Sequence, residues 1–151
     1  MAGGAAADDP DVGILATRLL YSFQREMFTL LSEQGHGQLR PRHGAVLAFI
    51  EPNGTRASDL SERSGQHKQV IGTLVDELEQ LGYVSRQPDP SDRRAKLVVP
   101  TERGRDQMAK ARGIREAIER RYARSVGAER FSVFKQVFTE LAEPRPASPP
   151  A

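Results

Sequence analysis

Apolar residues recur at helical spacing in the first third of the chain. Over residues 11–33 an apolar side chain returns every third or fourth position, which predicts a helix. Further apolar residues widen this stripe, so the helix must be buried on more than one side. The segment Gly-His-Gly at 35–37 ends it. A second helix is expected over residues 41–51, because Pro41 suits a first helical turn.

The middle of the chain predicts two helices and a β hairpin. The helices cover residues 57–64 and 66–81, with Gly65 at the turn between them. Short strands are expected at 83–86 and 97–100, separated by a polar loop.

The last third of the chain predicts two more helices. Thr101 can cap a long, strongly basic helix that runs to about residue 124, and Gly127 breaks the helical pattern. The final helix carries a broad apolar face made of Phe131, Phe134, Val137, Phe138 and Leu141. Residues 1–10 and 143–151 have the composition of disordered tails. The fold class predicted is mainly α with one hairpin.

The two central helices have the features of a helix-turn-helix. Leu60 on the first helix can contact Ile71 and Leu74 on the second, with a tight turn between them. The opposite side of the second helix shows hydrogen-bonding groups near its N-terminus, as a helix in the DNA major groove requires: Lys68, Gln69, Gly72 and Thr73. A plain helical hairpin with a polar outer face also fits this stretch. Gly72 costs about 1 kcal/mol of helix stability relative to Ala, and close approach to DNA would explain it.

The hairpin after these helices is basic. Arg93, Arg94 and Lys96 at the tip of a two-stranded ribbon can reach phosphates or a narrow minor groove. Asp92 can pair with Arg94 and hold it extended. A basic hairpin directly after a helix-turn-helix is a wing, and the combination is more specific than either part.

Two segments of the central region are distinctive, LVDELEQLGYV at 74–84 and PDPSDRRAKLVVPTERG at 88–104. Through these segments the sequence resembles the MarR (multiple antibiotic resistance regulator) family. This resemblance implies a winged helix-turn-helix with a two-stranded β wing and with N- and C-terminal dimerisation helices. The expected organisation is a single domain, 11–142. Its dimerisation helices are assigned to 11–35 and 102–142, and its DNA-binding lobe to 41–101.

The resemblance also implies which residues contact DNA. Base or phosphate contacts are assigned to Gln66, His67, Lys68, Gln69, Gly72 and Thr73 in the second helix, and to Asp92, Arg93, Arg94 and Lys96 in the wing. Arg94 has the main wing role, with Asp92 orienting it. His67 stands where many members have a capping Ser or Thr, and Gln66 stands where an apolar residue is usual. The departures predict either a frayed helix start or a different base preference.

Many members of this family are repressors released by small phenolic or lipophilic ligands. Family geometry implies a pocket near Phe23, Met27, His43 and Leu47. An ordinary, partly buried position is the competing interpretation of His43. The expected partners are thus double-stranded DNA, a second copy of the chain and a small aromatic or lipophilic effector.

Composition adds mainly exclusions. The net charge of +2 says little about nucleic acid by itself, although Arg86 also lies in the basic hairpin stretch. Cysteine is absent, which excludes disulfides, thiolate zinc sites and a cysteine redox switch. The three histidines lack metal-ligand spacing, and no phosphate loop or nucleophile elbow occurs. We expect no enzyme, cofactor or metal. Without a secretory signal or membrane span, a cytoplasmic location is expected.

Two functions remain from these patterns. The first is a DNA-binding, ligand-responsive repressor that binds a near-palindromic operator as a homodimer, since the first and last helices carry more apolar surface than the central lobe can cover. The alternative is a winged-helix module for protein–protein interaction with no direct DNA role. Steep salt dependence of duplex binding would distinguish the first from the second.

Overall fold

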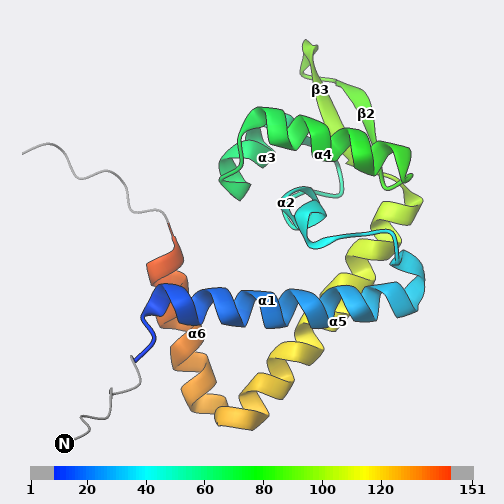
Figure 1. The fold of residues 1–151 in the computed structure, drawn as a ribbon. Helices are drawn as coiled ribbons and strands as arrows, with labels where there is room; N and C mark the ends of the chain where they lie inside the picture. The colour runs from blue at the N-terminus through cyan, green and yellow to red at the C-terminus, as the bar shows by residue number, and fades with distance from the viewer. Residues whose placement is uncertain (1–8, 144–151) are drawn as a thin grey trace, which may run out of the picture. The chain divides into compact units, whose positions relative to one another are not determined.

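The computed structural model describes residues 9–143, so most of the two predicted tails lies outside the described residues. Helices make up most of the described chain, and the strands form one small antiparallel sheet (Figure 1), which confirms the predicted fold class. The helices are α1 (Val12–Leu31), α2 (Gly44–Leu47), α3 (Ala57–Ser64), α4 (Lys68–Gln80), α5 (Glu102–Val126) and α6 (Ala128–Ala142). The strands are β1 (Thr55–Arg56), β2 (Val84–Asp89) and β3 (Asp92–Pro100).

The chain before the central motif contains the long helix α1, one wide helical turn, a 3₁₀ helix (Pro41–His43) and the short helix α2. Asp11 caps α1 by accepting a hydrogen bond from the Ile14 amide at 2.9 Å. A wide turn, Ser32–His36, follows α1 and contains Gly35 at φ 96°. The helix predicted over 41–51 is wrong in length, because only a 3₁₀ turn and the four residues of α2 are helical.

The helix-turn-helix agrees with the sequence pattern except at one boundary. Gly65 ends α3 with φ 72°, a left-handed conformation that glycine adopts without a steric penalty. The following helix begins at Lys68 rather than at Gln66. Gln66 lies in the turn. Its backbone amide donates to Ser64 Oγ at 3.2 Å, and its backbone carbonyl accepts from Ser61 Oγ at 2.6 Å.

The sheet differs from the predicted hairpin in two respects. Its strand order is β1-β3-β2, so a two-residue strand is added to the two strands of the wing. The polar loop expected between residues 86 and 97 is wrong. The strand β2 continues to Asp89 and β3 already begins at Asp92, so only two residues separate the strands. Apart from Asp89, residues 87–96 are not buried, so the sequence of this part of the ribbon lacks the alternation by which a strand is recognised.

One apolar core joins residues 39–50, α3, α4 and the sheet into a lobe. Leu60 and Ile71 are fully buried, and Tyr83 is the largest side chain enclosed. The cluster contains Leu39, Val46, Leu47, Ile50, Leu60, Ile71, Leu74, Val75, Leu78, Tyr83, Val84 and Val98. Phe28 of α1 packs against it. The sheet and the α3–α4 pair therefore form one packed body.

The described chain separates into two compact units, one ending at Ile114 and one beginning at Arg115 within α5. In the second unit Tyr122 and Phe131 place their ring centroids 6.3 Å apart. Gly127, at φ 95°, separates α5 from α6 as the sequence predicts. None of the described helices is long and apolar enough to cross a membrane.

Candidate nucleic-acid interface

The second helix of the motif turns its apolar side inward and its polar side outward. Its buried residues are Ile71, Leu74, Val75 and Leu78. Lys68, Gln69 and Thr73 are exposed, and Gly72 is half-buried. The orientation predicted from the spacing is therefore the one found. The assignment of these four residues to DNA contact remains a prediction.

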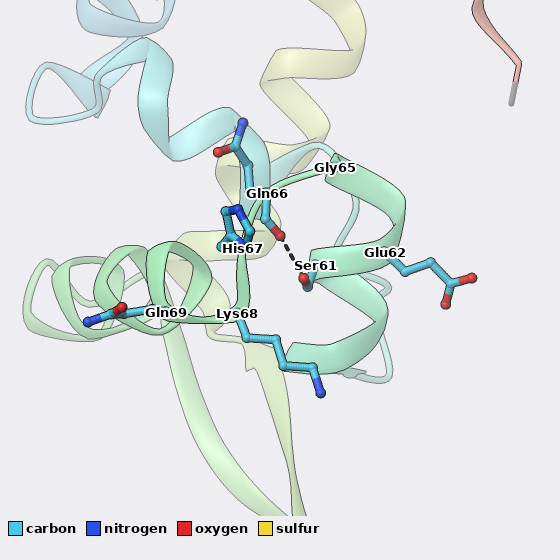
Figure 2. Close-up of a pocket in the computed structure, with 7 residues that line it drawn as sticks. All are labelled: Ser61, Glu62, Gly65, Gln66, His67, Lys68 and Gln69. Atoms are coloured by element: carbon cyan, nitrogen blue, oxygen red, sulfur yellow. Dashed lines mark hydrogen bonds between the residues drawn. The ribbon is translucent and has the colours of Figure 1, made fainter.

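A hollow of about 610 Å³ lies where α3 turns into α4. Figure 2 shows its lining, in which the side chains of Glu62 and Lys68 extend outward from the turn. The lining residues are Ser61, Glu62, Gly65, Gln66, His67, Lys68 and Gln69. Four of the predicted DNA-contacting residues thus gather at one exposed turn.

His67 stands at the N-cap of α4 without capping it. Its backbone is extended, with φ −60° and ψ 148°, but its side chain accepts no hydrogen bond from the first turn. A serine or threonine here would occupy one of the free N–H groups of the helix. Those groups stay available to an anion, for which a helix N-terminus is electrostatically favourable.

Neither backbone conformation nor steric crowding by the described residues requires glycine at position 72. Its backbone has no positive φ, and a Cβ built on it meets nothing within 4 Å. Glycine in a helix interior costs about 1 kcal/mol relative to alanine. Close approach of the helix backbone to DNA at Gly72 stays a prediction.

The wing presents exposed cations. Arg93, Arg94 and Lys96 are all exposed on β3. Contrary to the prediction, Asp92 does not pair with the Arg94 guanidinium. Its Oδ1 accepts a hydrogen bond from the Arg94 backbone amide at 3.0 Å, because two residues of separation suit such a local turn. Asp92 therefore shapes the backbone at the tip, and the Arg94 side chain is exposed there.

Arg86 belongs to a different arrangement from the other cations of the hairpin. Its guanidinium pairs with Asp76 at 2.7 Å and with Glu79 at 2.8 Å, both on α4. Its backbone amide also donates to Glu79 Oε2 at 3.1 Å. Arg86 therefore offsets part of the negative charge at the end of α4 and joins β2 to α4.

Asp89 and Arg56 form a contact that the sequence did not reveal. Asp89 Oδ2 accepts from Arg56 Nε at 2.7 Å and lies 2.6 Å from Nη2. Asp89 Oδ1 accepts from the Ser91 amide at 2.9 Å and from its hydroxyl at 2.8 Å. Hydrogen bonds from Ser91, and then from Arg56, hold the pKa of Asp89 below its usual value. No spacing rule connects residues so far apart, so only the folded ladder brings them together.

His43 has a structural role in the lobe. It is 1% exposed, and its Nδ1 accepts from the Arg40 amide at 2.9 Å. Nε2 therefore carries the proton that is donated to Glu77 Oε2 at 2.9 Å. This bond, and one from Arg42, keep the pKa of Glu77 below its usual value. Both ring nitrogens are occupied by protein groups, so any ligand would meet the ring only through its carbon atoms.

The other residues of the predicted ligand pocket are divided between the core and α1. Leu47 belongs to the buried cluster, whereas Phe23 and Met27 are half-buried. Gln107, which the sequence did not single out, is 3% exposed and its Oε1 has no hydrogen-bond partner. The pocket itself stays a prediction.

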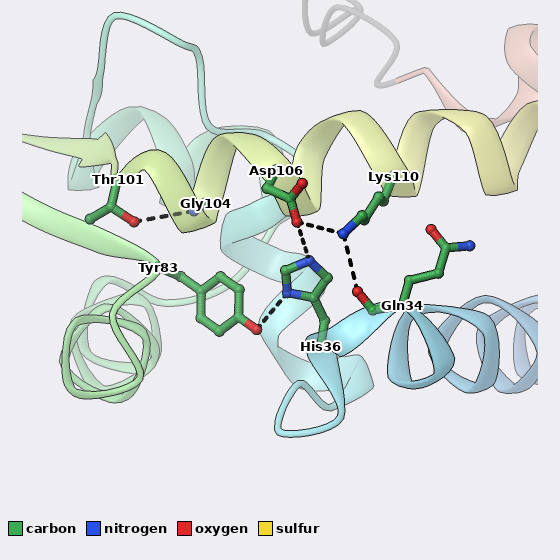
Figure 3. A network of polar contacts seen from close by, with 7 residues as sticks. All are labelled: Gln34, His36, Tyr83, Thr101, Gly104, Asp106 and Lys110. Atoms are coloured by element: carbon green, nitrogen blue, oxygen red, sulfur yellow. Dashed lines mark hydrogen bonds and ion pairs between the residues drawn. The ribbon is translucent and has the colours of Figure 1, made fainter.

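A buried histidine also connects the start of α5 to the lobe (Figure 3). His36 Nε2 donates to Asp106 Oδ2 at 2.9 Å, and Nδ1 lies 2.8 Å from the Tyr83 hydroxyl. Lys110 contacts the same carboxylate at 2.8 Å and the Gln34 carbonyl at 3.1 Å. The bonds from Lys110 and His36 lower the pKa of Asp106. Within residues 9–143, no group of His, Asp and Glu side chains is arranged to hold a metal ion.

Comparison with known proteins gives concordant results. Residues 38–95 match the sequence model of the MarR family. CouR from Rhodococcus jostii RHA1, in a crystal structure bound to p-coumaroyl-CoA, is 29% identical with a TM-score of 0.74, covering 97% of this chain and 100% of that chain. A MarR-family regulator from Rhodococcus sp. RHA1 is 28% identical with a TM-score of 0.72, covering 95% and 100%.

A curated relative matches over a shorter stretch. The uncharacterized HTH-type transcriptional regulator YcgE of Bacillus subtilis (strain 168) is 43% identical over 44 residues. That stretch is 29% of this chain and 29% of the relative, so it spans less than a third of either protein.

Proposed function

We propose that the chain, which matches the MarR family model over residues 38–95, is a ligand-responsive repressor of that family that binds a near-palindromic operator as a homodimer. The observation that carries the proposal is one lobe that exposes both a polar helix start and a basic wing. Lys68 and Gln69 project from the first turn of α4, and Arg93 and Arg94 project from the ribbon. Such a lobe suits a major groove and the minor groove beside it.

Each group has a distinct role in this proposal. Lys68, Gln69 and Thr73 read base edges or neighbouring phosphates, and Gly72 lets the helix backbone approach closely. Arg94 enters the minor groove, where the negative potential is strongest when the groove is narrow. Arg93 and Lys96 contact phosphates. Gln66 and His67 add contacts to DNA from the turn, and the unused N–H groups at the start of α4 face the DNA phosphates.

The homodimer follows from apolar surface that one chain leaves uncovered. On α6 the exposed apolar residues are Val133, Phe134, Val137, Phe138 and Leu141, between 39% and 66% exposed. On α1 they are Val12, Ile14, Leu15, Leu20 and Tyr21, between 45% and 67% exposed. The exposed apolar residues of α6 recur at helical spacing on one side of that helix, and an exposed apolar face of this kind marks a protein–protein interface. In the proposal 11–35 and 102–142 are dimerisation segments of a single functional domain.

The effector proposed is a small aromatic or lipophilic compound. The Rhodococcus jostii relative binds p-coumaroyl-CoA, whose acyl group is a phenol joined to an unsaturated chain. Phe23 and Met27 supply apolar, polarisable surface on α1, and the free acceptor of Gln107 could take a hydrogen bond from a phenolic hydroxyl. The relatives are transcription regulators, and nothing in the site assigns this chain a reaction. A repressor of chromosomal genes acts in the cytoplasm.

The proposal is tested by selecting duplexes from a random pool and titrating the best one at several salt concentrations. The logarithm of the affinity should fall linearly with that of the salt concentration, because each neutralised phosphate releases counterions. Arg94→Ala should weaken binding by about 1–3 kcal/mol, while Arg93→Ala should act evenly on selected and unrelated duplexes. Equal affinity of Arg94→Ala and wild type at matched salt would refute the wing assignment. A protein that enriches no duplex would instead favour the protein-interaction alternative.

A further inference from the structure

One ion pair joins the tip of the wing to the start of the helix-turn-helix. Arg56 is the last residue of β1 and immediately precedes α3, whereas Asp89 is the last residue of β2 and immediately precedes the turn of the wing. Because β3 lies between β1 and β2 in the sheet, these two residues belong to strands that share no backbone hydrogen bonds. The pair therefore connects the two outer strands.

The geometry of the pair is that of a specific contact rather than a loose surface bridge. The Asp89 side chain is 7% exposed and that of Arg56 is 38% exposed. Two guanidinium nitrogens approach one carboxylate oxygen, and the other oxygen is bonded twice to Ser91. Both carboxylate oxygens thus have donors, as a buried carboxylate requires. Removing Arg56 would leave that charge partly uncompensated.

The wing needs such a support. A two-stranded ribbon is only marginally stable by itself, and here the register shifts between Pro88 and Asp89, where the ladder becomes irregular. The hydrogen bonds of Asp89 and Asp92 to Ser91 and Arg94 are local to the turn. In the described part of the chain, Arg56 provides the ion pair that ties this turn to the rest of the lobe.

We propose that Arg56 is a positioning residue for the wing. Its contact with Asp89 fixes the turn relative to the first residue of α3, and so places Arg94 for its contact with DNA without touching DNA itself. The inference rests on the proposed DNA-binding function. It predicts that the contribution of Arg56 to operator binding passes through Arg94.

The first test is made on the free, full-length protein. Hydrogen exchange at the Ser91 amide and in peptides covering the turn should be about three- to tenfold faster in Arg56→Gln and in Asp89→Asn than in wild type. The matched control is Arg42→Gln, which removes the same charge from an ion pair with Glu77 outside the wing. In the Arg42→Gln variant, the amides of the wing turn should exchange at the wild-type rate. Unchanged exchange in both wing variants would overturn the inference.

The second test uses the duplex that the wild-type protein selects from a random pool. Arg56→Gln should weaken binding about fivefold in the wild-type background but less than twofold when Arg94 is already alanine. Arg56→Lys, which keeps one charged donor, should recover part of the loss. Equal losses in the two backgrounds would refute a positioning role, because independent residues act additively.

The salt dependence separates positioning from direct contact. If Arg56 touched a phosphate itself, Arg56→Gln would reduce the salt slope by about one unit even with Arg94 replaced, and the inference would be wrong. If the wild-type protein selects no duplex, the proposed function fails. The exchange measurement then still decides whether Arg56 holds the wing in position.

Discussion

Replacing Gly72 with alanine should make the free protein more stable and its complex with DNA weaker. The residue lies inside α4, its backbone is compatible with any L-residue, and a Cβ would meet nothing within 4 Å. No strain opposes the substitution, so the full difference in helix propensity, about 1 kcal/mol, should appear in the free energy of unfolding. For a chain of this size that corresponds to a rise in Tm of roughly 2–4 °C.

The DNA measurement should change in the opposite direction. A methyl group at a site of close backbone approach would displace α4 from the groove, and we expect a loss of about 1–3 kcal/mol, the value of one good base contact. Gly113→Ala in α5 is the matched control, since its Cβ also meets nothing and its φ is not positive. It should add similar stability and leave DNA affinity unchanged. A Gly72→Ala protein that is stabilised yet binds the selected duplex as tightly as wild type would refute the reasoning.

Three further substitutions test other parts of the account. Gly104→Ala should lower the free energy of unfolding by about 1–3 kcal/mol in urea denaturation, because a Cβ there would overlap the Tyr83 carbonyl oxygen; wild-type stability would show that the start of α5 does not pack there. Asp106→Asn should destabilise the protein at pH 7. Because folding lowers the pKa of Asp106, the stability that its carboxylate contributes is complete above the unfolded pKa of about 4 and is lost as the pH falls through the folded pKa. The difference in unfolding free energy between variant and wild type should therefore shrink in acid. An equal difference at pH 7 and pH 3 would contradict the ion-pair explanation. Phe134→Asp should convert the dimer to monomers in analytical ultracentrifugation and abolish operator binding; a variant that sediments like a dimeric wild type would exclude α6 from the interface.

The sequence predicted the elements that have a periodic apolar face. The spacing of Ile71, Leu74 and Leu78 placed one side of α4 in the core, and the structure confirms it. Thr101 was predicted to cap α5, and its hydroxyl oxygen accepts from the Gly104 amide at 3.1 Å. Both features depend on residues within a few positions of one another, where sequence spacing determines geometry.

The errors occur where long-range contacts decide the structure. The strands of the wing extend through polar residues because backbone pairing, not burial, holds them. The two residues of β1 are too few for any pattern to show. Part of the apolar surface of α1 is covered within the same chain, since Leu31 is fully buried and Phe28 packs on the core.

The elements that carry the candidate site residues were predicted from the sequence, but the contacts that support these residues were not. Arg93, Arg94 and Lys96 lie on the ribbon as expected. By contrast, Arg86 looked like a further cation for DNA, and its pairing with Asp76 and Glu79 depends on how β2 crosses α4. The partners of His43 are likewise brought together by the fold, with Glu77 on another helix.

The central claim is that two copies of this lobe read one DNA site. The most direct test determines both the sequence symmetry of duplexes selected from a random pool and the number of chains bound to each in analytical ultracentrifugation. The account predicts a near-palindrome whose half-sites lie about 34–36 Å apart, one helical turn, with two chains per duplex. A single asymmetric half-site bound tightly by one folded chain would contradict it.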